Sequence, residues 1–85
     1  MSRRRSEAQI LADILNISLN GVKVTRLMYQ ANLSYSTLRK YLLATMKQKL
    51  VEKLSNSDGS VEYCTTEKGK LFLRKLKEVT HVLRS

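Results

Sequence analysis

The sequence TRLMYQANLSYSTLRKYL, residues 25–42, predicts a short helix, a tight turn and a second helix. Asn32 stands where the chain has to pass through a left-handed conformation, which asparagine tolerates better than most residues other than glycine. Ser34 follows with a side-chain oxygen that can cap the second helix, whose first N–H groups otherwise lack partners. Four leucines are spaced so that the two helices close on each other, namely Leu27, Leu33, Leu38 and Leu42.

The outward face of the second helix, expected over residues 35–47 or 35–49, is predicted to carry hydroxyls and cations. These are Ser36, Thr37, Arg39, Lys40 and, one turn on, Lys47. Such a face fits the major groove of duplex DNA, where cations and hydroxyls reach phosphates and base edges. The remaining candidate DNA contacts on this pair of helices are Thr25, Arg26, Ser34 and Tyr35. Tyr35 is equally compatible with a supporting role, and Tyr41 is expected to be a half-buried support.

The chain begins with a basic tail, residues 1–6, that has no apolar anchor and is expected to be mobile. Two roles stay open for it. It is either a solvated end or an arm whose Arg3, Arg4 and Arg5 contact phosphates or a minor groove. A first helix is predicted to start after Ser6, because Ser6 and Gln9 have the spacing of a capping box.

That first helix is expected to end at Gly21, a C-cap residue. The β-branched residues that follow favour a short edge strand over residues 21–24, after which Thr25 is expected to cap the next helix. Further on, residues 50–54 and 61–65 predict two strands, and Asp58-Gly59 between them is a strong turn signal. The tip of this hairpin has an aspartate and neither lysine nor arginine, which argues against a strong minor-groove contact.

A last helix is predicted after a cap at Thr65 or Thr66, with Gly69 permitting close packing against the hairpin or the first helix. An apolar stripe on this helix repeats at steps of four, three and four, through Phe72, Leu76, Val79 and Leu83. Further apolar residues lie off the stripe, whereas a helix covering so small a domain needs only one apolar side. The surplus predicts a partner helix, most simply that of a second copy of the chain.

The composition favours a polyanionic partner. The chain has 85 residues, enough for one domain, and its 16 Lys and Arg against seven Asp and Glu give a net charge of +9. Residues 1–49 hold nine basic and two acidic side chains, so the half that contains the two paired helices carries most of the excess. Nucleic acid is expected before an anionic membrane, although basic surfaces also simply aid solubility.

Other classes of protein are disfavoured by what the sequence lacks. Cys64 is the single cysteine, so a reducing compartment is expected, and no apolar run reaches the length of a membrane span. His81 has no second ligand at metal spacing, and no nucleophile–base set or glycine-rich phosphate loop is present. We therefore expect a cytoplasmic protein that is not an enzyme and uses no metal or cofactor.

The order of these pieces resembles a known family. L-x-x-x-A-N-L-S-Y-S-T-L-R-K-Y-L is similar to the helix-turn-helix of winged-helix DNA-binding proteins. The later Leu50-Val51-Glu52-Lys53 and Tyr63-x-x-Thr66-Glu67-Lys68-Gly69-x-x-Phe72-Leu73 resemble the wing and closing helix of small archaeal regulators. Over residues 7–83 the chain resembles the Sulfolobus ten-kilodalton winged-helix chromatin proteins and the archaeal regulators grouped with them.

This resemblance implies a mainly α, winged helix-turn-helix fold with a small β-hairpin and a C-terminal dimerisation helix. Residues 1–85 then form a single domain, with the tail over 1–6, the winged-helix core over 7–65 and the last helix over 66–84. The implied function is double-stranded DNA binding as a homodimer, either as a transcriptional regulator or as a chromatin-associated protein. The alternatives are a protein-interaction subunit of a larger nucleic-acid-handling assembly and, less favoured for want of stacking aromatics, an RNA-binding protein.

Overall fold

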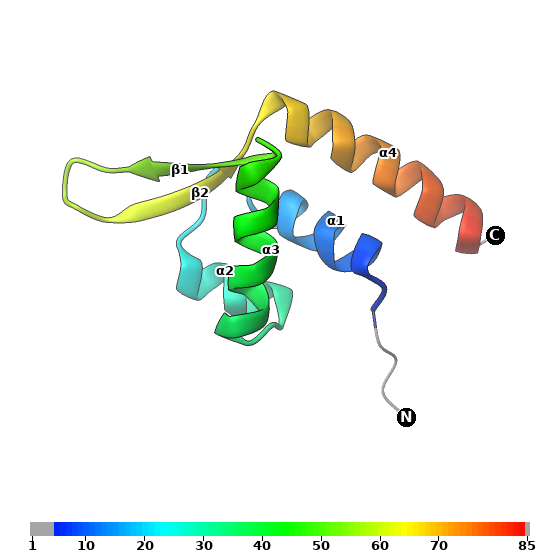
Figure 1. Cartoon of the computed structure of the whole chain (residues 1–85), viewed down its shortest axis with the longest axis horizontal. Coiled ribbons are helices and arrows are strands. Elements are labelled where there is room, and N and C mark those ends of the chain that lie inside the picture. The colour runs from blue at the N-terminus through cyan, green and yellow to red at the C-terminus, as the bar shows by residue number, and fades with distance from the viewer. Residues whose placement is uncertain (1–4, 85) are drawn as a thin grey trace.

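The computed structural model describes the backbone of residues 5–84 and the side chains of residues 5–79. Within this range four helices and one two-stranded antiparallel hairpin follow each other (Figure 1). They are α1 (Glu7–Ile17), α2 (Val24–Ala31), α3 (Tyr35–Lys47), β1 (Val51–Ser55), β2 (Val61–Thr65) and α4 (Glu67–Arg84). The predicted winged-helix fold is confirmed, and none of the helices over residues 5–84 is long and apolar enough to cross a membrane.

The first helix starts as predicted and ends earlier. The Ser6 side chain accepts a hydrogen bond from the Gln9 N–H at 3.1 Å, and the Gln9 side chain accepts one from the Ser6 N–H at 3.2 Å. The predicted end at Gly21 was wrong, because α1 stops at Ile17 and Ser18 is its C-cap. Gly21 lies in the turn that follows, with φ of +88°, and donates its N–H to the Ser18 carbonyl.

The start of α2 is set by a contact with the hairpin. Val22 and Tyr63 exchange two backbone hydrogen bonds of 2.9 and 2.8 Å, so the predicted edge strand is a single antiparallel bridge. This bridge keeps the chain extended as far as Lys23, which is the N-cap of α2 and makes no side-chain capping bond. The prediction that Thr25 caps this helix was therefore wrong, since Thr25 lies inside the first turn.

The turn between α2 and α3 has the predicted geometry. Asn32 is left-handed, with φ of 55° and ψ of 51°, and its N–H reaches back to the carbonyls of Met28 and Tyr29. Ser34 caps α3 by accepting a hydrogen bond from the Thr37 N–H at 3.3 Å. The two helices close over Leu27, Leu38 and Leu42, all buried, while Leu33 is partly buried at the edge. Ala31 of α2 is buried with them, and the core extends beyond these two helices through Ile14, Leu15, Val22, Leu50, Val51 and Leu73.

The hairpin and α4 are tied to the body at the end of β2. The Thr65 hydroxyl donates at 2.6 Å to the carbonyl of Leu15, a residue of α1. Thr66 is the cap of α4, because its hydroxyl oxygen accepts from the Gly69 N–H at 3.0 Å while donating to the Lys49 carbonyl. A side chain on Gly69 would overlap the carbonyl oxygen of Leu50, so the predicted close packing occurs where α3 joins β1.

The last helix packs along α1, and its inner side lies next to the stripe that was predicted to face a partner helix (Figure 1). Leu73, which lies off that stripe, is buried in the core. Leu76, which belongs to the stripe, is partly buried against the same core, so the protein's own fold already covers part of it. Phe72 and Val79 lie on the flank of this inner side and are 37% and 54% exposed. The side chain of Leu83 lies outside the described residues.

Candidate nucleic-acid interface

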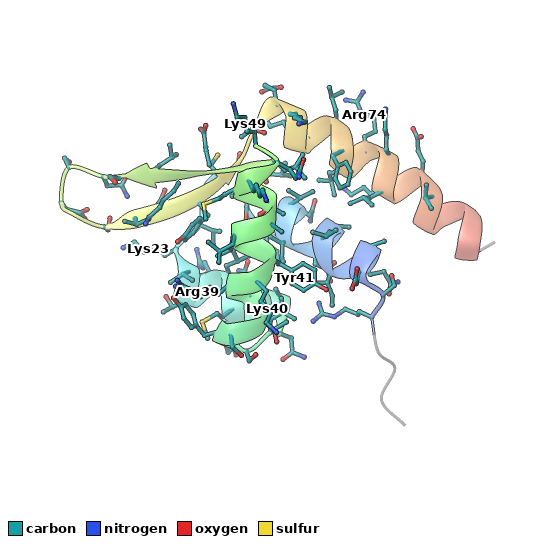
Figure 2. All side chains as sticks on the ribbon, in the orientation of Figure 1. Lys23, Arg39, Lys40, Tyr41, Lys49 and Arg74 are labelled. Atoms are coloured by element: carbon teal, nitrogen blue, oxygen red, sulfur yellow. The ribbon has the colours of Figure 1, made fainter. Side chains whose placement is uncertain are left out.

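The outward face of α3 carries most of the predicted contacts. Ser36, Arg39, Lys40 and Lys47 are exposed, and Thr37 is half-buried. Figure 2 shows Arg39 on the side of α3 nearer the hairpin and Tyr41 on the side nearer α1. Tyr41 packs against the core, so its predicted supporting role is confirmed. One helix therefore separates a buried leucine face from a face of cations and hydroxyls, which is the arrangement a groove-binding helix requires.

The start of α3 gathers hydroxyl groups. The Ser34 hydroxyl donates to the Thr37 hydroxyl at 3.0 Å and lies 3.3 Å from the Ser36 hydroxyl. Since Ser34 also caps the helix, its oxygen is committed to holding the helix terminus. No acidic residue occupies the first turn of α3, so the partial positive charge of this helix end is not neutralised. Phosphate oxygens are favoured at such a terminus.

Tyr35 is both exposed and engaged with a cation. The residue is 50% exposed, and its hydroxyl oxygen accepts a hydrogen bond from Arg39 Nη1 at 3.3 Å. The bond joins residues one helical turn apart and restricts the positions of the guanidinium. The sequence left Tyr35 open between contact and support, and in the structure its hydroxyl holds the guanidinium of Arg39.

The predicted basic arm divides into two parts. Arg5 forms an ion pair with Asp13 of α1 at 2.7 Å and donates to the Asn32 carbonyl at 3.2 Å. It thus ties α1 to the turn before α3, an assignment that the sequence did not foresee. Arg3 and Arg4 lie outside the described residues. The other two candidates, Thr25 and Arg26, are exposed on α2.

The tip of the hairpin is acidic, as its sequence indicates. The Asp58 carboxylate accepts hydrogen bonds from the Ser60 hydroxyl at 2.6 Å and from the Ser60 N–H at 2.9 Å. The hydroxyl bond is the main cause that lowers the pKa of Asp58 below its ordinary value, followed by the backbone bond. Asp58 therefore stays ionised well below neutral pH, and the tip presents a negative charge.

Three exposed lysines near α3 were missed by reasoning from the sequence. Lys23 precedes α2, Lys49 follows α3, and Lys53 lies on β1 (Figure 2 labels the first two). Lys49 has a left-handed backbone with φ of 61°, a conformation that favours glycine or asparagine. The signal for Lys53 was present in the sequence: strand alternation puts it on the same face as Val51, which is buried.

Candidate metal ligands and the cysteine are the other side chains that bear on function in the part of the chain that the structure describes. Among the side chains of residues 5–79, no group of three His, Cys, Asp or Glu is placed to hold a metal ion. Cys64 is half-buried in β2, with its sulfur 3.7 Å from the Leu19 carbonyl oxygen.

Known proteins share both the sequence pattern and the fold. The family model described as winged helix-turn-helix matches residues 4–84. Uncharacterized protein MJ0290 of Methanocaldococcus jannaschii is 34% identical over 83 residues, which cover 96% of this chain and 37% of that protein. The chain thus spans little more than a third of this relative's length.

Two solved structures cover nearly the whole chain. Sso10a-2, a DNA-binding protein from Sulfolobus solfataricus, superposes with a TM-score of 0.86 and 29% identity, covering 94% of this chain and 83% of that one. SSV1 F-93 superposes with a TM-score of 0.72 over 99% of this chain and 97% of its own. At 19% identity the second of these is evidence for the fold alone.

Proposed function

The chain belongs to the winged helix-turn-helix family, and from this premise we propose that it binds double-stranded DNA through the outward face of α3. The observation that carries the proposal is the exposure of Arg39 and Lys40 on a helix whose opposite face is anchored in the core by Leu38 and Leu42. The likeness to Sso10a-2, itself a DNA-binding protein, supports it. A transcriptional regulator and a chromatin-associated protein would both use this surface.

In the proposed complex α3 enters the major groove. Its hydroxyl-rich start and the exposed cations then face phosphates and base edges. The net charge of +9 supplies long-range attraction to the polyanion. Such a role needs no cofactor, and it implies a cytoplasmic, nucleoid-associated location.

We further propose that the protein acts as a homodimer joined through α4. The flank of this helix exposes Phe72 and Val79, and Leu76 lies between them at the edge of the core. Leu83 follows at the same helical spacing. A two-fold pairing of these flanks would cover the exposed apolar surface and set two α3 helices apart, ideally by about 34 Å, one turn of DNA. Palindromic sites would then be favoured.

A protein-interaction role is the alternative, and one observation favours it. Tyr29 on α2 is 87% exposed and lines a shallow hollow together with Met28 and Leu33. A partner protein could cover this surface without engaging α3. The two functions are separated by whether nucleic acid binds at all.

The proposed function is tested by titrating three labelled oligonucleotides of equal length with the protein at low salt. They are a mixed-sequence duplex of roughly 20 base pairs, enough for two adjacent half-sites, a single DNA strand and a single RNA strand. We expect the duplex to bind tightest, because the exposed face of α3 fits a DNA groove and few exposed aromatic side chains are available to stack on unpaired bases. Tighter binding of either single strand would favour a stacking mode, and no binding of any would favour the protein-interaction role.

A further inference from the structure

A small hollow lies in the corner between α3 and the hairpin. It has a volume of about 160 Å³ and is lined by residues of α2, α3 and both strands of the hairpin. Its apolar lining comes from Val24 of α2 and from Leu42, Leu43 and Met46 of α3. Polar groups complete the lining, from Tyr35 and Arg39 on α3 and from Lys53 and Tyr63 on the hairpin.

The strand register explains why a lysine faces this hollow. Lys53 pairs with Tyr63, and the neighbouring pair on the same face is Val51 with Thr65. Both members of that neighbouring pair are buried against the body of the protein. The face of the hairpin that is buried at Val51 and Thr65 therefore continues to Lys53 and Tyr63, which lie beyond the edge of the core and beside α3.

The same register keeps the two glutamates of the hairpin away from the hollow. Glu52 and Glu62 belong to the opposite face of the hairpin, where they pair with Cys64 and Leu54. Among the described residues, those that line the hollow include two cations and no carboxylate. One cation is also held in place, because Arg39 donates to the Tyr35 hydroxyl. The site is thus positively charged, and one of its cations is held in position by a hydrogen bond.

We propose that this hollow binds one phosphate of the DNA backbone, at the edge of the groove that α3 enters. The inference rests on the proposed function and adds to it a residue outside α3. Arg39 and Lys53 contact the non-bridging oxygens from two sides, and the attached sugar packs on Leu43 and Met46. The phosphate-binding part of the wing is accordingly its root, where it meets α3, whereas the tip carries the ionised Asp58.

The test compares Lys53→Gln with two matched variants in titrations of a mixed-sequence duplex at several salt concentrations. Lys53→Gln is expected to weaken binding about 3- to 10-fold and to make the slope of log K against log salt shallower by about 0.9 per protein copy. Arg74→Gln removes an equal charge from an exposed position on α4, away from α3 (Figure 2), and should leave both quantities unchanged. Lys53→Arg keeps the cation and should retain both.

Each result decides the proposal. If the unmodified protein binds the duplex and Lys53→Gln behaves like Arg74→Gln, the phosphate site is wrong and the proposed function stands. If the unmodified protein does not bind the duplex, both are wrong. Matching thermal melts for the variants exclude a folding defect, which is not expected because the Lys53 side chain is exposed.

Discussion

Replacing both Arg39 and Lys40 with alanine is expected to weaken duplex binding by about 2 kcal/mol or more, at least roughly 30-fold. Both side chains are exposed, so the double variant should fold like the unmodified protein. A loss that depends on the DNA sequence would mean that at least one of them contacts a base edge. A loss that is uniform across sequences, with a shallower salt dependence, would mean phosphate contacts only. The measurement is a fluorescence-anisotropy titration with several duplexes.

The control for this variant lies at the hairpin tip. Asn56→Ala combined with Ser57→Ala removes two exposed polar side chains and leaves α3 untouched. Since the tip carries an ionised aspartate, we expect the tip pair to cost less than the helix pair. The opposite order would show that the protein docks by its wing and that α3 has been assigned the wrong role.

A charge on the flank of α4 is expected to separate the two copies of the proposed dimer. Val79→Glu puts a carboxylate on the same flank as the exposed Phe72, two helical turns away, where a second apolar helix would otherwise pack. The variant should be a helical monomer whose duplex affinity falls by about 100-fold or more, because the two α3 helices no longer bind as one unit. Sedimentation velocity and circular dichroism measure the first two properties.

Leu71→Glu is the matched control, since Leu71 is 55% exposed on the same helix and Val79 is 54% exposed. Leu71 lies off the flank, so this variant should remain a dimer. Equal dissociation of both variants would place the interface elsewhere on α4. An unmodified protein that sediments as a monomer at concentrations on the order of tens of micromolar would refute the dimer itself.

The parts of the fold that could be predicted are those with a local chemical cause. Asn32 and Ser34 determine the α2–α3 turn through their own backbone and side-chain hydrogen bonds, and Asp58-Gly59 determines the hairpin turn in the same way. The exposed cations of α3 followed from helical periodicity. The resemblance to the archaeal winged-helix proteins, read from the order of such local signals, is confirmed by the family match and by the likeness to Sso10a-2.

The errors occurred where a contact distant in sequence decides the outcome. Thr25 looked like a cap, but the bridge between Val22 and Tyr63 keeps the chain extended only as far as Lys23. On α4 the sequence indicated apolar residues on more than one side, but periodicity alone did not tell which side packs on the core; the structure places Leu73 there. The position of Lys53 at the hollow beside α3 likewise depends on how the hairpin packs against the rest of the protein.

The role of Arg5 could not be read from its neighbours either. In the sequence it is one of three consecutive arginines, which indicates a phosphate-binding arm. In the structure its guanidinium bridges Asp13 and the Asn32 carbonyl, residues 8 and 27 positions away. Only the folding of α1 against the α2–α3 turn brings these two acceptors together.

The central claim, that the cations of this fold bind duplex DNA, is tested most directly by the salt dependence of the binding constant. The excess of seven positive charges in residues 1–49 lies in the part of the chain that contains α3. If roughly four to six phosphates are neutralised per bound unit, log K should fall with log salt at a slope of about −4 to −5. A flat response, or no duplex binding at low salt, would contradict the claim.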